Sequence, residues 1–296
     1  NVEGLQDHDA LFKIGKIFGI HHLALEDVVV HQRAKLENYS NNALLLVPMP
    51  CLEKNQSANS HSCEFEQVTI LFGKDYVISF QDGLPGDCFE VVRRQLSTPE
   101  SPARLRATDY LAYRLLDSII DHYFPLVDDI DERITACEEE VFGSPGRDVI
   151  NKIRQIKRDV SGLERRIRPL AESLKGWERL LEHLTEEETR LEVRDCIDHA
   201  RQLVDTLTSQ KDLATGLIDD YISLLSFKTN EVMRALTVIT VMFMPMTLIA
   251  GIYGMNFEVL PELKWRFGYP LALGGMLLCA ALFFAYCRRR GWIGSD

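Results

Sequence analysis

Two long apolar stretches near the C-terminal end dominate the hydrophobic pattern of the chain. Residues 235–252 and 269–287 contain no Asp, Glu, Lys or Arg. Each approaches the roughly 20 residues that an α-helix needs to cross about 30 Å of hydrocarbon. The segment between them is too short to form a domain. The pattern therefore predicts a hairpin of two transmembrane helices, which makes the lipid bilayer a partner of this multi-pass chain.

Basic residues mark the two outer ends of this hairpin. Three arginines at 288–290 follow the second stretch, and Lys228 and Arg234 precede the first. Positively charged residues beside membrane helices preferentially face the cytoplasm. Both termini are therefore expected to be cytoplasmic, in the plasma (inner) membrane, and only residues 254–268 are expected to lie on the outside.

The first hundred residues mix short helical and strand-like patterns. Apolar residues recur at helical spacing in two segments, whereas three later runs are short and are separated by Asn, Ser, Gly and Lys-Asp turns, as is typical of strands. The predicted helices are 9–18 and 22–29, and the predicted strands are 43–47, 65–72 and 76–80. Residues 1–5 resemble the end of a strand and its turn, so an N-terminal portion of this domain is expected to precede them.

Three long helical patterns fill residues 107–252. The first runs to about 142, the second runs from 147 to about 183, and the third opens at Thr185, where Glu188 completes a capping box. Apolar residues of the third pattern alternate in steps of three and four, the period of a helix-bundle seam. They are Ala200, Leu203, Leu207, Ala214, Leu217, Tyr221 and Leu224, with Gln210 in the same register. Nothing breaks this pattern before the first apolar stretch, so one helix of roughly 65 residues is expected to link cytoplasm and membrane.

These patterns together predict an α+β membrane protein with a cytoplasmic α/β domain, a long helical stalk and two transmembrane helices per subunit. The expected boundaries are 1–104 for the α/β domain, 105–184 for long antiparallel cytoplasmic helices, 185–253 for the stalk helix and first span (membrane part about 235–252), 254–268 for the outer loop, 269–287 for the second span and 288–296 for a basic tail.

The composition narrows the range of functions expected for the chain. The chain has 44 acidic against 33 basic residues and a net charge of −11. Nucleic-acid binding depends on clustered Lys and Arg, so nucleic acid is not expected as a partner. A net negative charge favours binding of cations, and it also favours solubility. The sequence contains no P-loop, nucleophile elbow, zinc-protease or dinucleotide motif, so we predict that the chain is not an enzyme and uses no organic cofactor.

Small and polar residues share one face of the first apolar stretch. They continue the spacing of the preceding helix, shifted by one residue, and are Asn230, Met233, Thr237, Thr240, Met244, Thr247 and Gly251. In a single hairpin such residues allow close helix packing in lipid. With several copies around an axis the same face would line a pore. Met233, Met244 and the neighbouring Leu236 would then form apolar rings that gate by dewetting, and Asn230 would form a polar ring near the cytoplasmic mouth.

The segment between the two apolar stretches carries a family resemblance. Gly254-Met255-Asn256 follows the first stretch, with Thr229-Asn230-Glu231-Val232-Met233 at its foot. Further matching segments are 244–247, 261–263, 268–270 and 288–292, and upstream His31-Gln32-Arg33-Ala34-Lys35 is similar to an early signature, with Ala34 where Pro is usual. Over essentially its whole length the chain resembles the CorA family of magnesium and cobalt channels.

This resemblance implies a funnel-shaped homopentamer in which five stalk helices continue as the inner ring of the membrane part. Gly254, Met255 and Asn256 would form the selectivity filter, with five Asn256 amides that hydrogen-bond Mg²⁺ while the ion keeps its water. Glu258 and Glu262 would raise the local cation concentration, although solvated loop charges are also common. The expected cargo is Mg²⁺, and Co²⁺ and Ni²⁺ are expected to follow the same path into the cytoplasm.

The resemblance also implies a regulatory Mg²⁺ site between subunits. Glu53, Asp117 and Asp195 match the acidic residues of that site, and Mg²⁺ bound there would hold the gate closed. Acidic residues on helix surfaces are also commonly solvated without a metal. Two other functions stay open at this point: a zinc transporter of the same superfamily, and a membrane-anchored cytoplasmic scaffold that does not transport.

Overall fold

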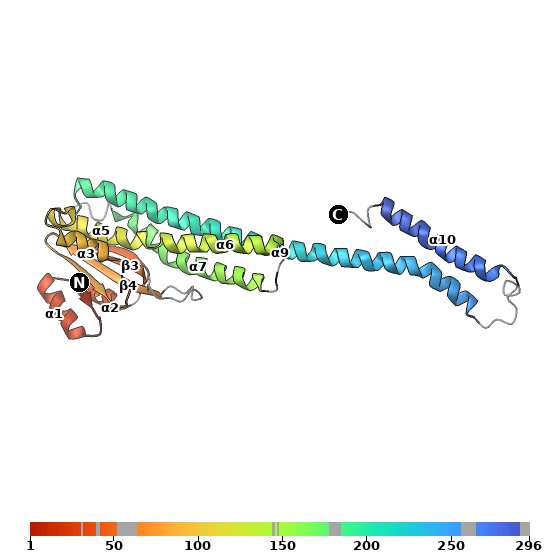
Figure 1. The fold of residues 1–296 in the computed structure, drawn as a ribbon. Coiled ribbons are helices and arrows are strands. Elements are labelled where there is room, and N and C mark those ends of the chain that lie inside the picture. The colour runs from red at the N-terminus through yellow and green to blue at the C-terminus, as the bar shows by residue number, and fades with distance from the viewer. Residues whose placement is uncertain are drawn as a thin grey trace. The chain divides into compact units, whose positions relative to one another are not determined.

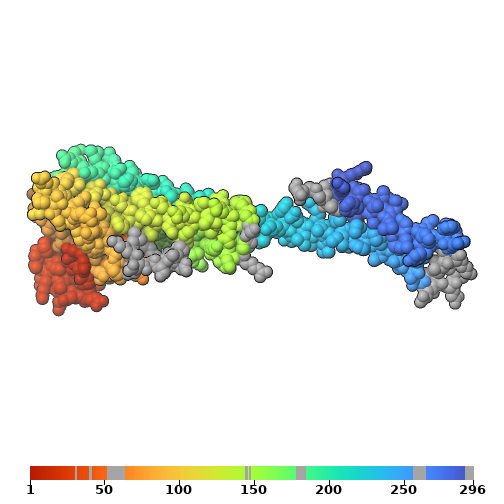
Figure 2. All heavy atoms as spheres, in the orientation of Figure 1, coloured from red at the N-terminus to blue at the C-terminus, as the bar shows by residue number. Residues whose placement is uncertain are grey.

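The computed structural model describes residues 1–30, 32–39, 42–51, 64–143, 146, 148–177, 185–255 and 265–290. The chain divides into two compact units, Asn1–Ile218 and Asp219–Asp296, and Figure 1 labels their elements. Within the first unit, Figure 2 shows the N-terminal helices in red as a lobe that adjoins the orange and yellow part of the same unit.

A five-stranded sheet forms the centre of the first unit. Its strands are β1 (Val2–Glu3), β2 (Lys35–Tyr39), β3 (Asn42–Cys51), β4 (Glu64–Gly73) and β5 (Val77–Gln81), in the order β1-β5-β4-β3-β2. β1 is parallel to β5, and the other neighbours are antiparallel. The three predicted strands are confirmed, and β3 extends well beyond its predicted end.

Both faces of the sheet are covered, which explains why β3 and β4 are apolar over nearly their whole lengths. The helices α1 (His8–Phe18) and α2 (His22–Val29) pack on one face, where the fully buried Val28 joins the core. Phe72 of β4 stacks on Trp177, with ring centroids 5.6 Å apart and both side chains fully buried. The sheet is therefore covered by protein on both faces, rather than exposed to solvent on one of them.

One predicted helix is in fact two. The pattern predicts a single helix over residues 107–142, and this prediction is wrong, because the structure has α5 (Thr108–Asp121) and α6 (Phe124–Gly143). Pro125 lacks the N–H that a continuous helix would donate to the Asp121 carbonyl, and its ring would clash with that carbonyl. Tyr123 fills the break, where it is fully buried and donates its hydroxyl to the Pro48 carbonyl at 2.6 Å.

The other helices are α3 (Glu90–Ser97), α4 (Pro102–Leu105), α7 (Val149–Leu174), α9 (Glu187–Tyr253) and α10 (Gly268–Arg289). In the first unit α9 packs against α6 and α7: the Gln210 amide donates to the Val127 carbonyl at 2.9 Å, and Lys211 lies 2.8 Å from Glu164. The predicted seam is confirmed from Ala200 to Leu217, where burial is nearly complete at Ala200, Leu203, Leu207, Gln210, Ala214 and Leu217. Its last two predicted members, Tyr221 and Leu224, are only half-buried.

The helix α9 is uninterrupted over 67 residues, begins in the first unit and ends in the second. This confirms the prediction of a single helix that includes both the stalk and the first apolar stretch. α9 and α10 are the two helices long and apolar enough to cross a membrane among the residues that the structure describes. The mixed sheet, the long helix and the second apolar helix confirm the predicted fold class.

Candidate ion pathway and metal-binding cluster

All residues predicted to line a pore lie on the described part of α9. They are Asn230, Met233, Leu236, Thr237, Thr240, Met244 and Thr247, and each is exposed in the single chain. Met244 is 60 % exposed. The adjacent face of α9 is covered instead, since Val238 is buried and Pro245 is half-buried. A contiguous exposed face on an apolar helix indicates a contact surface for lipid or for other protein chains.

The threonines of this face use their hydroxyl protons within their own helix. Thr237 donates to the Met233 carbonyl at 2.7 Å, and Thr240 donates to the Leu236 carbonyl at 2.9 Å. Thr247 does the same toward the carbonyl four residues before it. A hydroxyl has one proton and two lone pairs. With the proton engaged, each threonine offers its lone pairs to the surroundings, and a hydrated cation donates hydrogen bonds from its water to such acceptors.

The C-terminal end of α9 is shaped by glycine. The helix ends at Tyr253, and the Gly254 N–H still bonds the Ala250 carbonyl at 2.9 Å. A Cβ at Gly254 would come within 3.1 Å of that carbonyl oxygen, so glycine suits the closure of the last turn. Met255 follows and is 51 % exposed. The remaining predicted residues of this end, Asn256, Glu258 and Glu262, lie outside the described residues.

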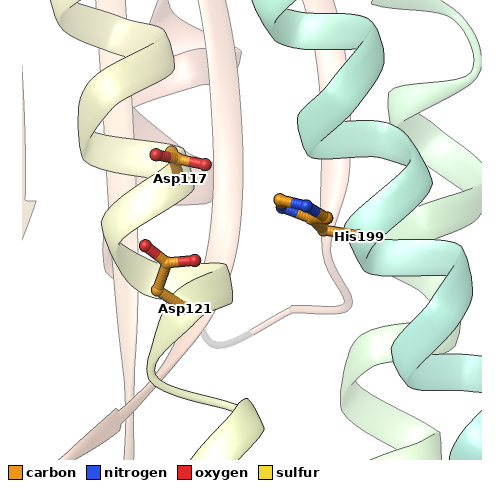
Figure 3. A group of neighbouring side chains, drawn as sticks. All are labelled: Asp117, Asp121 and His199. Atoms are coloured by element: carbon orange, nitrogen blue, oxygen red, sulfur yellow. The ribbon is translucent and has the colours of Figure 1, made fainter.

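A second candidate site lies in the first unit, between α5 and α9. Asp117, Asp121 and His199 offer ligand atoms that all lie within 4.8 Å of one another. Figure 3 shows the two carboxylates extending from neighbouring turns of α5 toward the helix that carries the imidazole. Asp117 is 8 % exposed, whereas Asp121 is exposed. Two carboxylates and an imidazole can bind a divalent cation, with water in the remaining positions.

The surroundings of Asp117 are electrostatically costly for its negative charge. Burial raises the pKa of the Asp117 carboxyl, and Asp121 raises it further, whereas Arg114 opposes both effects. The Arg114 guanidinium donates to Asp117 at 2.6 Å. Burial next to these acids also raises the pKa of the Cys196 thiol well above its usual value. A bound cation would relieve the repulsion between the two carboxylates, so the cluster suits a divalent ion.

His199 completes the cluster with an imidazole that is only partly engaged. Its Nδ1 atom is buried and has no hydrogen-bond partner within the part of the chain that the structure describes. Its Nε2 atom lies 3.8 Å from a carboxylate oxygen of Asp195, one turn earlier on α9. Phe124 meets the ring edge-on, with centroids 5.9 Å apart. Phe124 and Asp195 therefore limit the positions of the His199 ring. Its Nδ1 atom is free for a ligand.

The structure brings two of the three predicted regulatory residues close to one another. Asp117 lies in the cluster, and Asp195 borders it through His199 with its side chain 72 % exposed. Glu53 lies outside the described residues. Asp121 and His199 were not among the predicted ligands, although each lies four residues after a predicted one. That spacing places both members of a pair on one helix face, and it was the available signal.

An acidic extramembrane unit, two helices apolar enough to cross a membrane and a polar stripe along one of them define a membrane protein of the ion-transporting class. The chain belongs to the CorA-like Mg²⁺ transporter family, whose model matches residues 4–289. Members of this family are transporters, which confirms the prediction that the chain is not an enzyme.

Two curated relatives are similar over nearly the whole chain. The cobalt/magnesium transport protein CorA of Thermotoga maritima is 40 % identical over 294 residues, covering 99 % of this chain and 82 % of the relative. The putative metal ion transporter YfjQ of Bacillus subtilis is 31 % identical over 278 residues, covering 93 % of this chain and 83 % of the relative.

Solved structures share the fold at lower identity. The complete CorA magnesium transporter of Methanocaldococcus jannaschii matches with a TM-score of 0.79 at 22 % identity, over 96 % of this chain and 87 % of that one. The full-length CmaX protein matches with a TM-score of 0.72 at 18 % identity, over 97 % of this chain and 86 % of that one. At these identities the likeness establishes the fold alone.

Proposed function

We propose that this protein is a homopentameric channel that passes Mg²⁺, and with it Co²⁺ and Ni²⁺, through the plasma (inner) membrane into the cytoplasm. The observation that carries the proposal is the exposed stripe of α9, where threonine oxygens and methionines share one face of a helix apolar enough to span a bilayer. Lipid does not satisfy outward lone pairs, whereas a water-filled axis does. Membership in a family of Mg²⁺ transporters supports the cargo.

Five copies arranged around an axis would turn the stripe inward and form a closed ring, as symmetric oligomers do. Gly254 and Met255 would lead into a ring of Asn256 amides at the outer mouth. Mg²⁺ loses its water reluctantly, so neutral amide oxygens select the ion by hydrogen-bonding its hydration shell. Met233, Leu236 and Met244 would supply apolar rings that close the path by excluding water.

The orientation follows from charge. Arg288 and Arg289 end α10, and Lys228 and Arg234 lie on α9 before its apolar part. By the preference of basic residues for the cytoplasmic side, both termini would lie in the cytoplasm. The first unit then samples cytoplasmic Mg²⁺, and the inside-negative membrane potential drives each charge inward with about 2.3 kcal/mol per 100 mV.

Mg²⁺ feedback would act through the cluster of the first unit. At high cytoplasmic Mg²⁺, the ion would be held by Asp117, Asp121 and His199, and by the exposed Asp195 together with Glu53 of neighbouring subunits. When Mg²⁺ is scarce, the carboxylates repel one another and the helices separate, which opens the gate. Burial raises the pKa of Asp117 and the neighbouring Asp121 raises it further, and a bound cation would offset both effects, which supports this role.

The decisive experiment measures cation uptake into liposomes by the wild type and by Asn256→Ala. We expect wild-type uptake of Mg²⁺ and its loss in the variant, with the mass of the detergent-solubilised particle unchanged. Preserved Mg²⁺ uptake in Asn256→Ala would contradict the proposed filter. Uptake of Zn²⁺ in place of Mg²⁺, measured with and without a pH gradient, would favour the zinc transporter, and no uptake of either ion by the wild type would favour the scaffold.

A further inference from the structure

A basic cleft in the first unit shares no residue with the acidic cluster. It has a volume of about 720 Å³ and lies between the sheet and α7. Its walls include Arg33, Lys35, Phe65, Arg165 and Arg166. Arg33 and Lys35 belong to the early signature whose first residue, His31, lies outside the described residues. Neither the pathway nor the metal cluster uses this segment.

The signature segment is held rigidly by buried polar contacts. Asp27 accepts from the Gln32 side-chain amide at 2.7 Å and from the Lys35 ammonium at 2.6 Å. Gln67 of β4 accepts from the Gln32 backbone N–H at 2.8 Å and donates to the Asp27 carbonyl at 3.1 Å. Because these bonds fix the backbone on both sides of Arg33, its position at the cleft is set before any ligand arrives.

The charge of Lys35 is compensated within the protein. Partial burial opposes charging of its ammonium, but the hydrogen bonds that the ammonium donates to Asp27 and Glu37 outweigh burial and raise the pKa of Lys35. The one carboxylate in the cleft wall, Glu66, is 1 % exposed and accepts from the Gly83 N–H at 2.6 Å. Burial raises the pKa of Glu66, and hydrogen bonds from the backbone around Gly83 oppose that shift. Neither group cancels the arginines.

Three arginines of the cleft lack a carboxylate partner within the described part of the chain. Arg33 and Arg165 are exposed and form no ion pair there. Arg166 donates to the Gly162 carbonyl at 2.8 Å, and its guanidinium lies 4.1 Å from the centroid of the Phe65 ring. In a chain of net charge −11, such a group of unpaired guanidinium ions indicates a site for an anion.

We propose that this cleft binds a nucleoside di- or triphosphate. Guanidinium groups bind phosphate oxygens in pairs, and Arg33 and Arg165 enter the cleft from two different elements. The Arg166–Phe65 stack offers a flat surface for a base. The cleft volume falls within the range of about 300–1,000 Å³ that is usual for small-molecule sites. This site is separate from the ion pathway, so its test requires no transport.

The test is nucleotide binding to the full chain in detergent, measured by calorimetry with ADP, pyrophosphate and adenosine. A chelator removes divalent ions, so that no nucleotide is held through Mg²⁺ at the acidic cluster. We expect ADP to bind, pyrophosphate to bind more weakly and adenosine more weakly still. Arg33→Glu and Arg165→Glu should each weaken ADP binding about tenfold or more, because each removes a charge-assisted pair.

Arg154→Glu is the matched control, since Arg154 is exposed on α7 but does not line the cleft. An equal loss in Arg154→Glu, no ADP binding at millimolar concentration, or pyrophosphate binding as tight as that of ADP would each overturn the proposal. A second measurement needs no variant: photo-crosslinking with azido-ADP should label peptides around residues 33 and 65. Labelling elsewhere alone would also overturn the proposal.

Discussion

At the scale of single residues, the threonines of α9 show how a helix can bond each hydroxyl proton internally and still present the hydroxyl oxygens on its surface. Each hydroxyl proton bonds the carbonyl four residues earlier, as in Thr240 and Leu236, a local bond open to Ser and Thr in helices. The outward lone pairs remain available. The sequence predicted the stripe from spacing, but the direction of each hydroxyl proton depends on side-chain rotamers that spacing does not determine.

Thr240→Val should reduce Mg²⁺ flux, because valine keeps the shape of threonine and removes the oxygen. Each hydrogen bond to water is worth about 1 kcal/mol, so a loss of about tenfold or more is expected in a ring of five. Thr240→Ser, which keeps the oxygen, should retain most of the flux. The measurement is Mg²⁺ uptake into liposomes. The control is Thr215→Val, an exposed threonine of α9 in the first unit with the same internal bond, and an equal loss there would contradict the prediction.

Asp117→Asn should weaken Mg²⁺ binding to the cluster between α5 and α9. Mg²⁺ at about 100 times its dissociation constant stabilises a folded protein by about 2.7 kcal/mol, and a tenfold weaker site loses about half of that. The measurement is the rise in melting temperature that Mg²⁺ causes in detergent, which should shrink in the variant. The control is Asp205→Asn at an exposed acid of α9 outside the cluster, which should leave that rise unchanged. An undiminished rise in Asp117→Asn would argue against the site.

The metal-binding cluster also shows that residue spacing does not reveal which helices face each other. The sequence places Asp121 one turn after Asp117, and His199 one turn after Asp195. Each spacing predicts a pair on one helix. That the two pairs face each other depends on the packing of α5 against α9, which are far apart along the chain. The imidazole was therefore missed, and Glu53, which lies outside the described residues, came only from resemblance.

At the scale of elements, apolar periodicity predicted the features that the local sequence determines. It missed the features that depend on contacts with neighbouring elements. The seam of α9 was visible because buried residues recur every three or four positions. The strand β2 was missed, since Lys35, Glu37 and Asn38 make it polar and only pairing with β3 defines it at the sheet edge. The break between α5 and α6 was marked by Pro125, a signal outweighed by the apolar pattern on both sides.

The contact between α7 and α9 carries a pH-dependent prediction. Hydrogen bonds from Lys211 and Arg168 lower the pKa of Glu164. The folded state therefore favours the carboxylate, and this stabilisation is present above the unfolded pKa of about 4.3 and lost as pH falls through the lower folded pKa. Glu164→Gln should lower the free energy of unfolding by about 0.5–1 kcal/mol near pH 7 and change it little near pH 3.

Urea unfolding in detergent at the two pH values measures this difference. Glu172→Gln provides the comparison, because Glu172 is exposed on the same helix and should give little change at either pH. If Glu164→Gln lost as much stability at pH 3 as at pH 7, the effect would come from side-chain packing rather than from the charge.

At the scale of the whole molecule, the chain separates into an acidic unit, which carries the candidate metal cluster, and an apolar unit, which carries the proposed ion pathway. The membrane hairpin was predictable because a run of uncharged residues long enough to cross lipid is a local signal. The number of subunits was not, since a single chain leaves the α9 stripe exposed without specifying how many copies cover it. Only the family resemblance supplied the pentamer.

Asp195→Lys tests whether the two units are coupled. Unlike the buried Asp117, Asp195 has a side chain that is 72 % exposed, so a neighbouring subunit can share a cation with it. Lysine there should repel Mg²⁺ and leave a channel that is less inhibited by Mg²⁺ on the cytoplasmic side. The measurement is the current through patches from liposomes, at increasing internal Mg²⁺. Asp205→Lys makes the same charge change ten residues further along α9 and should keep normal inhibition. Unchanged inhibition in Asp195→Lys would show that the acidic cluster does not control the gate, even if Mg²⁺ still binds to the cluster.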